Sequence, residues 1–70
     1  MTKMNAKLTR SLTDAQATRL QTIESEVAGN GSGNTLSARA GVRGSIIVTE
    51  RESDGTQAQV TIYPNGHAVY

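Results

Sequence analysis

The stretch from residue 45 to residue 70, SIIVTERESDGTQAQVTIYPNGHAVY, decides the fold because two turn signals divide it into three strand-like segments. Asp54-Gly55 and Asn65-Gly66 are pairs that tolerate the positive φ angles of a type I′ turn. Each pair therefore predicts a two-residue β-hairpin. Together they predict an antiparallel meander over residues 45–70, with three strands, or four if the segment before it joins the sheet.

Two-residue turns also fix the register that we expect for the meander. With Ser53 opposite Thr56, Ile47 faces Ile62, and strand alternation divides the side chains between two faces. One face carries Ile47, Thr49, Val60, Ile62 and Val69, and the other carries Ile46, Val48, Thr61, Tyr63, Ala68 and Tyr70. Both faces are then largely apolar near Ile46.

The second apolar face is the main reason for expecting a homo-oligomer. A single helix with a narrow apolar stripe covers one sheet face, and an exposed apolar face of that size is unfavourable in a monomer. We expect the oligomer interface to include Ile46, Val48, Tyr63 and Tyr70. The alternative is that the N-terminal segment folds over the second face.

The composition points in the same direction. The chain has 70 residues with no Phe, Trp or Cys and a single His. Disulfides and thiolate metal sites are thereby excluded, and one His argues against a structural zinc site. Small chains usually need a supplement to their core, and a partner subunit is the one that remains. We expect neither a metal nor a cofactor.

A helix is predicted over about residues 13–28. Thr13 is placed to cap it, and Gln16 three residues later completes a capping box. We expect Gly29 to end the helix in the left-handed conformation. The apolar stripe consists of Leu20, Ile23 and Val27, polar Gln16 adds nothing to it, and Arg19, Glu24 and Glu26 form the solvated side. Fold class is therefore α+β, with one amphipathic helix, a glycine-rich loop and an antiparallel sheet.

Residues 1–12 carry Lys3, Lys7 and Arg10 and no acid. Their apolar residues fit both strand and helix spacing, so we expect a flexible or weakly ordered basic segment that precedes a single domain over residues 13–70. This segment lacks the apolar central stretch of a secretory signal, and no apolar run approaches the roughly 18 residues that span a bilayer. We expect a cytoplasmic protein, of a cell or an infected host, without a membrane partner.

Glycines are concentrated in residues 29–44, which contain five of the seven in the chain. Residues 29–34 predict a loop, because no apolar residue other than glycine interrupts them. Alternation of small and apolar residues with polar ones predicts a strand over residues 35–43, with Arg39 and Arg43 on one side. A helical turn is the alternative, and it also brings the two arginines to one face.

Two arginines on one side suggest an anion site. Guanidinium groups donate hydrogen bonds in pairs to phosphate or carboxylate, and Ser37 and Asn34 can add polar contacts. The alternative is a loop that leads into an edge strand with solvated arginines.

We expect a non-catalytic binding or inhibitory protein, of the kind that phages and mobile elements encode. It would sequester or block either an anionic, nucleotide-like molecule held between subunits or a protein target. No paired nucleophile and base can be assembled, so we do not expect an enzyme. The alternative is a small nucleic-acid-binding regulator that contacts phosphates through the basic arm and the arginine strand.

Overall fold

A computed structural model describes residues 2–31 and 33–70. In chain order its elements are β1 (Thr2–Lys3), α1 (Ala6–Ser11), α2 (Asp14–Gly29), β2 (Thr35–Ala40), the 3-10 turn η1 (Val42–Gly44), β3 (Ile46–Arg51), β4 (Gln57–Ile62) and β5 (Ala68–Val69). Met1 and Ser32 lie outside the described residues. The predictions for segments 1–12 and 29–34 therefore have no structural outcome at these two positions.

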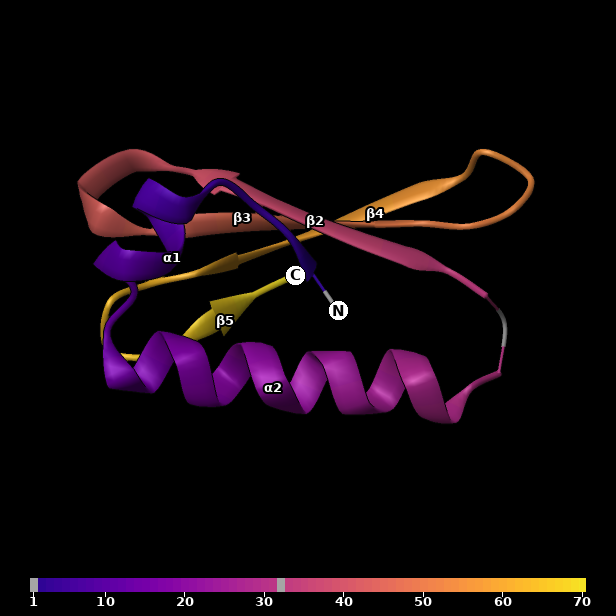
Figure 1. Ribbon diagram of the computed structural model, residues 1–70, viewed down its shortest axis with the longest axis horizontal. Helices are drawn as coiled ribbons and strands as arrows, with labels where there is room; N and C mark the ends of the chain where they lie inside the picture. The colour runs from indigo at the N-terminus through magenta and orange to yellow at the C-terminus, as the bar shows by residue number, and fades with distance from the viewer. Residues whose placement is uncertain (1, 32) are drawn as a thin grey trace.

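The protein is α+β, as the sequence predicts, with the long helix α2 lying along one face of the sheet (Figure 1). The sheet differs from the predicted antiparallel meander, because it has five strands in the order β1-β2-β3-β4-β5. β1 pairs parallel to β2, and the other neighbours are antiparallel. The sheet is therefore mixed.

The register of the β3–β4 hairpin differs from the prediction by one residue. Ile46 pairs with Ile62, whereas the two-residue turn would have paired Ile47 with Ile62. The Glu52 N–H donates to the Thr56 carbonyl at 2.8 Å, so the loop between them has three residues. Its last residue is a left-handed glycine with φ 92°, which is typical of a type I turn followed by a bulge.

The β4–β5 hairpin has the same construction. The Tyr63 N–H donates to the His67 carbonyl at 2.9 Å, and the Gly66 N–H donates to the Tyr63 carbonyl at 2.8 Å. Gly66 has φ 88°. Thr61 consequently pairs with Val69, whereas the two-residue turn would have placed it opposite Tyr70.

A shift of one residue moves side chains to the other face of a sheet, so the predicted division of faces is wrong. Ile46 and Val48 share the covered face with Val60 and Ile62, and each of the two is only 1% exposed. The buried core consists of Leu8, Leu20, Ile23, Leu36, Ile46, Val48, Val60 and Ile62. The apolar side chains of β3 and β4 are therefore mostly gathered on the side that α2 covers.

The opposite side of the sheet, which we call the open face, is mainly polar. Between Lys3 in β1 and Gln59 in β4 it carries hydroxyl, amide and cationic side chains, with Ile47 among them. The open face is therefore not the second apolar face from which a partner subunit was expected. The homo-oligomer itself stays a prediction.

The capping box of the main helix is confirmed. The Thr13 hydroxyl accepts from the Gln16 backbone N–H at 3.1 Å, and the Gln16 side chain accepts from the Thr13 N–H at 3.0 Å. The predicted end is wrong, because Gly29 is the last helical residue and the left-handed glycine is Gly31, with φ 63°. Asn30 lies between them as the C-cap.

Gln16 of α2 is buried, which differs from the prediction. Its side chain is 1% exposed, although the apolar pattern excluded it from the buried stripe. The side-chain Nε2 donates to the Gly44 carbonyl at 2.9 Å and to the Ile62 carbonyl at 3.1 Å. One amide thus ties the start of α2 to the end of β4 and to the turn before β3.

The N-terminal segment makes contacts with the rest of the chain, and its weak order stays a prediction. Thr2 donates to the Glu24 carboxylate through its backbone N–H at 2.8 Å and its hydroxyl at 2.9 Å. In α1, Leu8 is buried in the core, and Asn5 caps the helix through the Leu8 N–H at 2.7 Å. Thr2 and Leu8 therefore connect this segment to α2 and to the core.

Candidate functional site

The open face is arranged in rows of side chains from neighbouring strands. One row contains Lys3, Ser37, Thr49 and Gln59 from β1 to β4; the row on one side contains Thr35, Arg51 and Gln57, and the row on the other contains Arg39, Ile47, Thr61 and Val69. Residues two apart on a strand are about 7 Å apart. Three cations, Lys3, Arg39 and Arg51, therefore lie in three successive rows.

A hollow of about 430 Å³ lies on this face between β1 and β3. It is lined by Lys3, Thr35, Leu36, Ser37, Thr49 and Arg51. Two of these residues are cationic and three carry hydroxyl groups, and among the described residues no carboxylate lines it. Such a set of donors can hold an anion by combining charge with directed hydrogen bonds.

Strand alternation keeps the two acids that flank Arg51 in the sequence, Glu50 and Glu52, out of this hollow. Glu50 belongs to the covered face, in line with Leu36, and its carboxylate accepts from the Asn34 side-chain amide at 2.7 Å. Glu52 lies in the hairpin connection after β3. Alternation thus places a cation on the open face between two acids that lie elsewhere.

Gln57 lies directly across from Arg51 and positions its guanidinium. With the Gln57 amide turned so that its oxygen faces the arginine, that oxygen accepts from an Nη at 2.7 Å and from Nε at 3.1 Å. A guanidinium has five N–H donors, so further donors stay available to a ligand. This pairing holds the Arg51 head group over the sheet.

Arg39 and Arg43, which the sequence predicted on one side of a strand, do not belong to the same strand. Arg39 lies on the open face within β2 and is exposed. β2 ends at Ala40, so the alternation that would have aligned Arg43 with Arg39 stops before Arg43 is reached. The predicted strand over residues 35–43 is thus correct only over Thr35–Ala40.

Arg43 is exposed and adopts φ 55° and ψ 38°, the left-handed region that favours glycine. For other residues this conformation costs about 1–2 kcal/mol. The turn places its side chain outside the core at a backbone cost, which is a feature often found at functional positions.

Of the remaining predicted site residues, Ser37 lines the hollow and Asn34 does not. Asn34 instead donates to Glu50, as described above. Tyr63 is half-buried and stacks on His67 with ring centroids 6.4 Å apart. Tyr70, predicted in an oligomer interface, is 83% exposed.

Sequence reasoning missed Thr49 and Arg51 as site residues, and it considered Lys3 only as part of the basic arm in the nucleic-acid alternative. Thr49 and Arg51 alternate within the strand, and the correct register would have placed both beside Ser37 and Thr35. Lys3 had no such signal, because β1 has two residues and pairs with β2 through a contact far along the chain.

Comparisons of the chain with protein-family models, curated proteins and solved structures found no match. Within residues 2–31 and 33–70, no three His, Asp or Glu side chains are grouped so that they could hold a metal ion. None of the helices in those ranges is long and apolar enough to cross a membrane. The open face and its hollow are therefore the features of the structure that bear on function.

Proposed function

We propose that this chain is a non-catalytic binding protein whose open face holds a phosphate-bearing ligand. The observation that carries the proposal is the composition of the hollow, in which Lys3 and Arg51 accompany three hydroxyl side chains without a described carboxylate. Ammonium, guanidinium and hydroxyl donors together suit phosphate oxygens. The ligand would be a nucleotide or a similar anion, and binding would sequester it.

Binding without chemistry is supported by the same lining. An activated hydroxyl nucleophile needs a neighbouring base, such as His or a carboxylate. Neither residue type is found among the described residues that line the hollow. Thr35, Ser37 and Thr49 therefore serve as hydrogen-bond donors in this proposal.

A second candidate ligand is single-stranded nucleic acid, and the position of Arg39 favours it. Arg39 lies one row away from the hollow, so the three cations can contact more than one phosphate along a strand. Tyr63 and His67, which stack on each other in the β4–β5 connection, offer aromatic surface, although two rings are few for a base-stacking platform.

We further propose that ligand binding promotes self-association of the chain. Two open faces brought together would place cations against cations, which is unfavourable unless an anion lies between them. We therefore expect a homo-oligomer that forms or tightens when the ligand is present. Sedimentation velocity with and without inorganic pyrophosphate measures this directly.

Calorimetric titration with inorganic pyrophosphate, adenosine triphosphate and a short single-stranded oligonucleotide tests the proposed function. The variant Lys3→Gln/Arg51→Gln should bind about tenfold or more weakly, because it loses both cations of the hollow. Its matched control is Lys7→Gln/Arg10→Gln, which removes the same net charge from exposed positions of α1. The control should bind nearly as tightly as the unchanged protein.

Salt dependence separates the two ligand classes. Affinity for a long strand falls steeply with salt because many phosphates are neutralised at once, with a slope of about −0.7 per phosphate contact. A nucleotide held in the hollow should show a shallow slope and no gain with oligonucleotide length. The proposal fails if none of these ligands binds at millimolar concentration, or if the two double variants lose affinity equally.

A further inference from the structure

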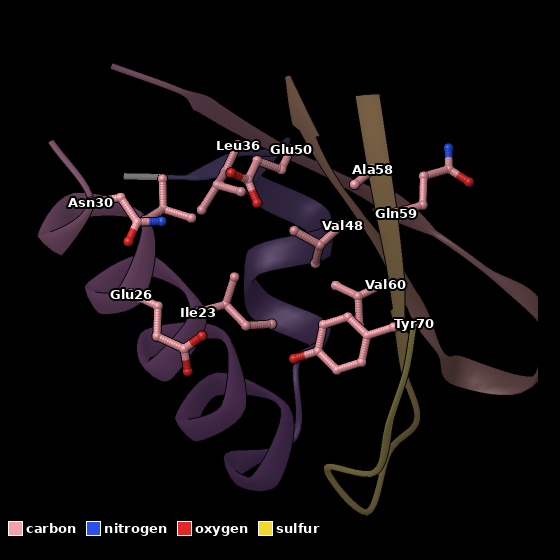
Figure 2. Close-up of a pocket in the computed structure, with 11 residues that line it drawn as sticks. Ile23, Glu26, Asn30, Leu36, Val48, Glu50, Ala58, Gln59, Val60 and Tyr70 are labelled. Atoms are coloured by element: carbon pink, nitrogen blue, oxygen red, sulfur yellow. The ribbon is translucent and has the colours of Figure 1, made fainter. Parts of the chain in front are cut away.

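A second concave site lies on the covered side of the sheet, between the C-terminal half of α2 and strands β2 to β4 (Figure 2). Its volume is about 120 Å³. The apolar part is formed by Ile23, Val27, Leu36, Val48, Ala58 and Val60. For comparison, an apolar cavity of about 150 Å³ admits benzene. This pocket is somewhat smaller and is open to solvent, so it has room for most of one apolar side chain.

The mouth of this pocket is acidic. Glu26 comes from α2 and Glu50 from β3, so the helix and the sheet each supply one carboxylate to the lining (Figure 2). Asn30 and Tyr70 add polar groups to the lining, to which Gln59 also belongs although its side chain points away from the pocket (Figure 2). No Lys, Arg or His belongs to the lining among the described residues. The charge pattern is thus opposite to that of the open face.

An unpaired strand edge runs beside the same pocket. β5 pairs with β4 only at Thr61 and Ile62, so within the described chain the part of β4 from Gln57 to Gln59 has no strand on that side. Ala58 and Gln59, which belong to this free part, also line the pocket. The edge and the pocket therefore form one continuous surface.

Hydrogen-bond alternation identifies the backbone groups that this edge offers. Glu52 and Thr56 form the closing hydrogen-bonded pair of the hairpin, so Ala58 directs its N–H and carbonyl toward β3. Gln57 and Gln59 direct theirs away from β3, toward the free edge. An added strand along the line of β5 would find two N–H and two carbonyl groups there.

From this juxtaposition we propose that β4 accepts an extended segment of a partner protein, which adds a strand at Gln57–Gln59. The segment carries a bulky apolar side chain that enters the pocket and, two residues away on the same face, a Lys or Arg that meets Glu26 and Glu50. Backbone bonds then supply affinity, while the pocket and its charge supply specificity. A second copy of this chain is disfavoured as the occupant, because a symmetric contact would bring the acids of two mouths together.

Fluorescence anisotropy with labelled peptides of about eight residues tests this proposal. The probe has a central Phe, one Lys two residues before it and another two residues after it, so that all three face the pocket, with Thr and Val at the other positions. Its partner peptide has Glu in place of Lys. The Lys peptide should bind about tenfold or more tightly than the Glu peptide. Glu26→Gln/Glu50→Gln should remove most of that difference, whereas Glu52→Gln, at the hairpin connection outside the pocket lining, should leave it unchanged.

Backbone pairing has its own test, which does not alter the protein. Two further Lys peptides carry N-methyl groups on alternate residues, one on the set that would face β4 and the other on the set that would face solvent. The peptide methylated on the set that faces β4 should lose binding, and the peptide methylated on the set that faces solvent should keep it. The reason is that a strand directs every second N–H to its neighbour. Gln59→Pro removes an outward N–H that makes no bond to β3, and it should weaken the unmethylated peptide.

The outcomes also separate this site from the open face. Lys3→Gln/Arg51→Gln should leave peptide affinity unchanged, so failure of anion binding and failure of peptide binding are distinguishable. The proposal is overturned if the Lys peptide does not bind at millimolar concentration, if both charge forms bind equally, or if both N-methylated peptides bind. Self-association that Gln59→Pro abolishes would also overturn it, since a second copy would then occupy the edge.

Discussion

Replacing Gln16 with Met should destabilise the fold strongly, although the sequence pattern of α2 left Gln16 out of the buried stripe. Met has a similar length and volume but lacks the amide, so packing is largely kept while three hydrogen bonds are lost. These bonds join the Gln16 side chain to the Thr13 N–H at 3.0 Å, the Gly44 carbonyl at 2.9 Å and the Ile62 carbonyl at 3.1 Å. The side chain is 1% exposed, so water cannot readily replace it.

The size of the effect follows from those bonds. Each contributes about 0.5–1.5 kcal/mol net, and buried partners that stay unpaired raise the loss, which gives about 3 kcal/mol. A chain of this length has a free energy of unfolding of about 3.5–10 kcal/mol in total. Urea unfolding followed by circular dichroism should therefore show a large fall in midpoint at unchanged slope. The control is Gln21→Met on the exposed side of α2, which should change stability by less than about 0.5 kcal/mol.

The variant Gln16→Glu adds a signature in pH. A carboxylate there would face the Gly44 and Ile62 carbonyl oxygens, so burial and repulsion raise the pKa of the new Glu in the folded state. Stability of this variant is then highest below the unfolded pKa of about 4.3 and is lost as pH rises through the folded value. Equal stability of Gln16→Met and the unchanged protein would refute the role assigned to this amide.

Three further predictions concern the turns. Gly66→Ala should cost more stability than Gly55→Ala, because both glycines have positive φ but only at Gly66 would a Cβ meet another residue, Ala15, at 3.1 Å; equal urea midpoints would contradict this. The Thr56 N–H donates to the Asp54 carboxylate and lowers the pKa of Asp54 below its ordinary 3.8, so the stabilisation is present above pH 3.8 and is lost as pH falls through the folded pKa. A carboxyl NMR titration of Asp54 with a midpoint at or above 3.8 would disprove it. Arg43→Gly should maintain or raise the urea midpoint by relieving left-handed strain, whereas Arg43→Val should lower stability by about 1 kcal/mol or more.

The predictions that succeeded rest on contacts close in sequence. The Thr13 and Gln16 capping box involves residues three apart, so the sequence pattern contains both partners. The two hairpins were placed correctly for the same reason. Their register was not, because Asp-Gly and Asn-Gly suit both a two-residue turn and a three-residue loop with a left-handed glycine. Because the loop has three residues and the prediction assumed two, every side chain of β3 lies on the opposite face, relative to β4, from the one predicted.

The features that were missed depend on distant partners. The Gln16 amide bonds to residues 28 and 46 positions away, which no local apolar pattern can reveal. β1 is short and is held by Glu24, 22 positions from Thr2, so its alternation alone could not distinguish strand from helix. The hollow of the open face could not be predicted for two reasons. Its lining includes Lys3 of β1, whose pairing has no local signal, and it includes Thr49 and Arg51, whose position depends on the register of β3.

The most direct test of the central claim, that the open face holds a phosphate-bearing ligand, is a two-dimensional 1H–15N NMR titration with inorganic pyrophosphate. The account predicts saturable shift changes centred on Lys3, Ser37, Thr49 and Arg51, with little change at the exposed α1 residues Lys7 and Arg10. Shifts that follow all cations alike, that centre on the glycine-rich loop over residues 29–34, or that do not appear at millimolar pyrophosphate would contradict it.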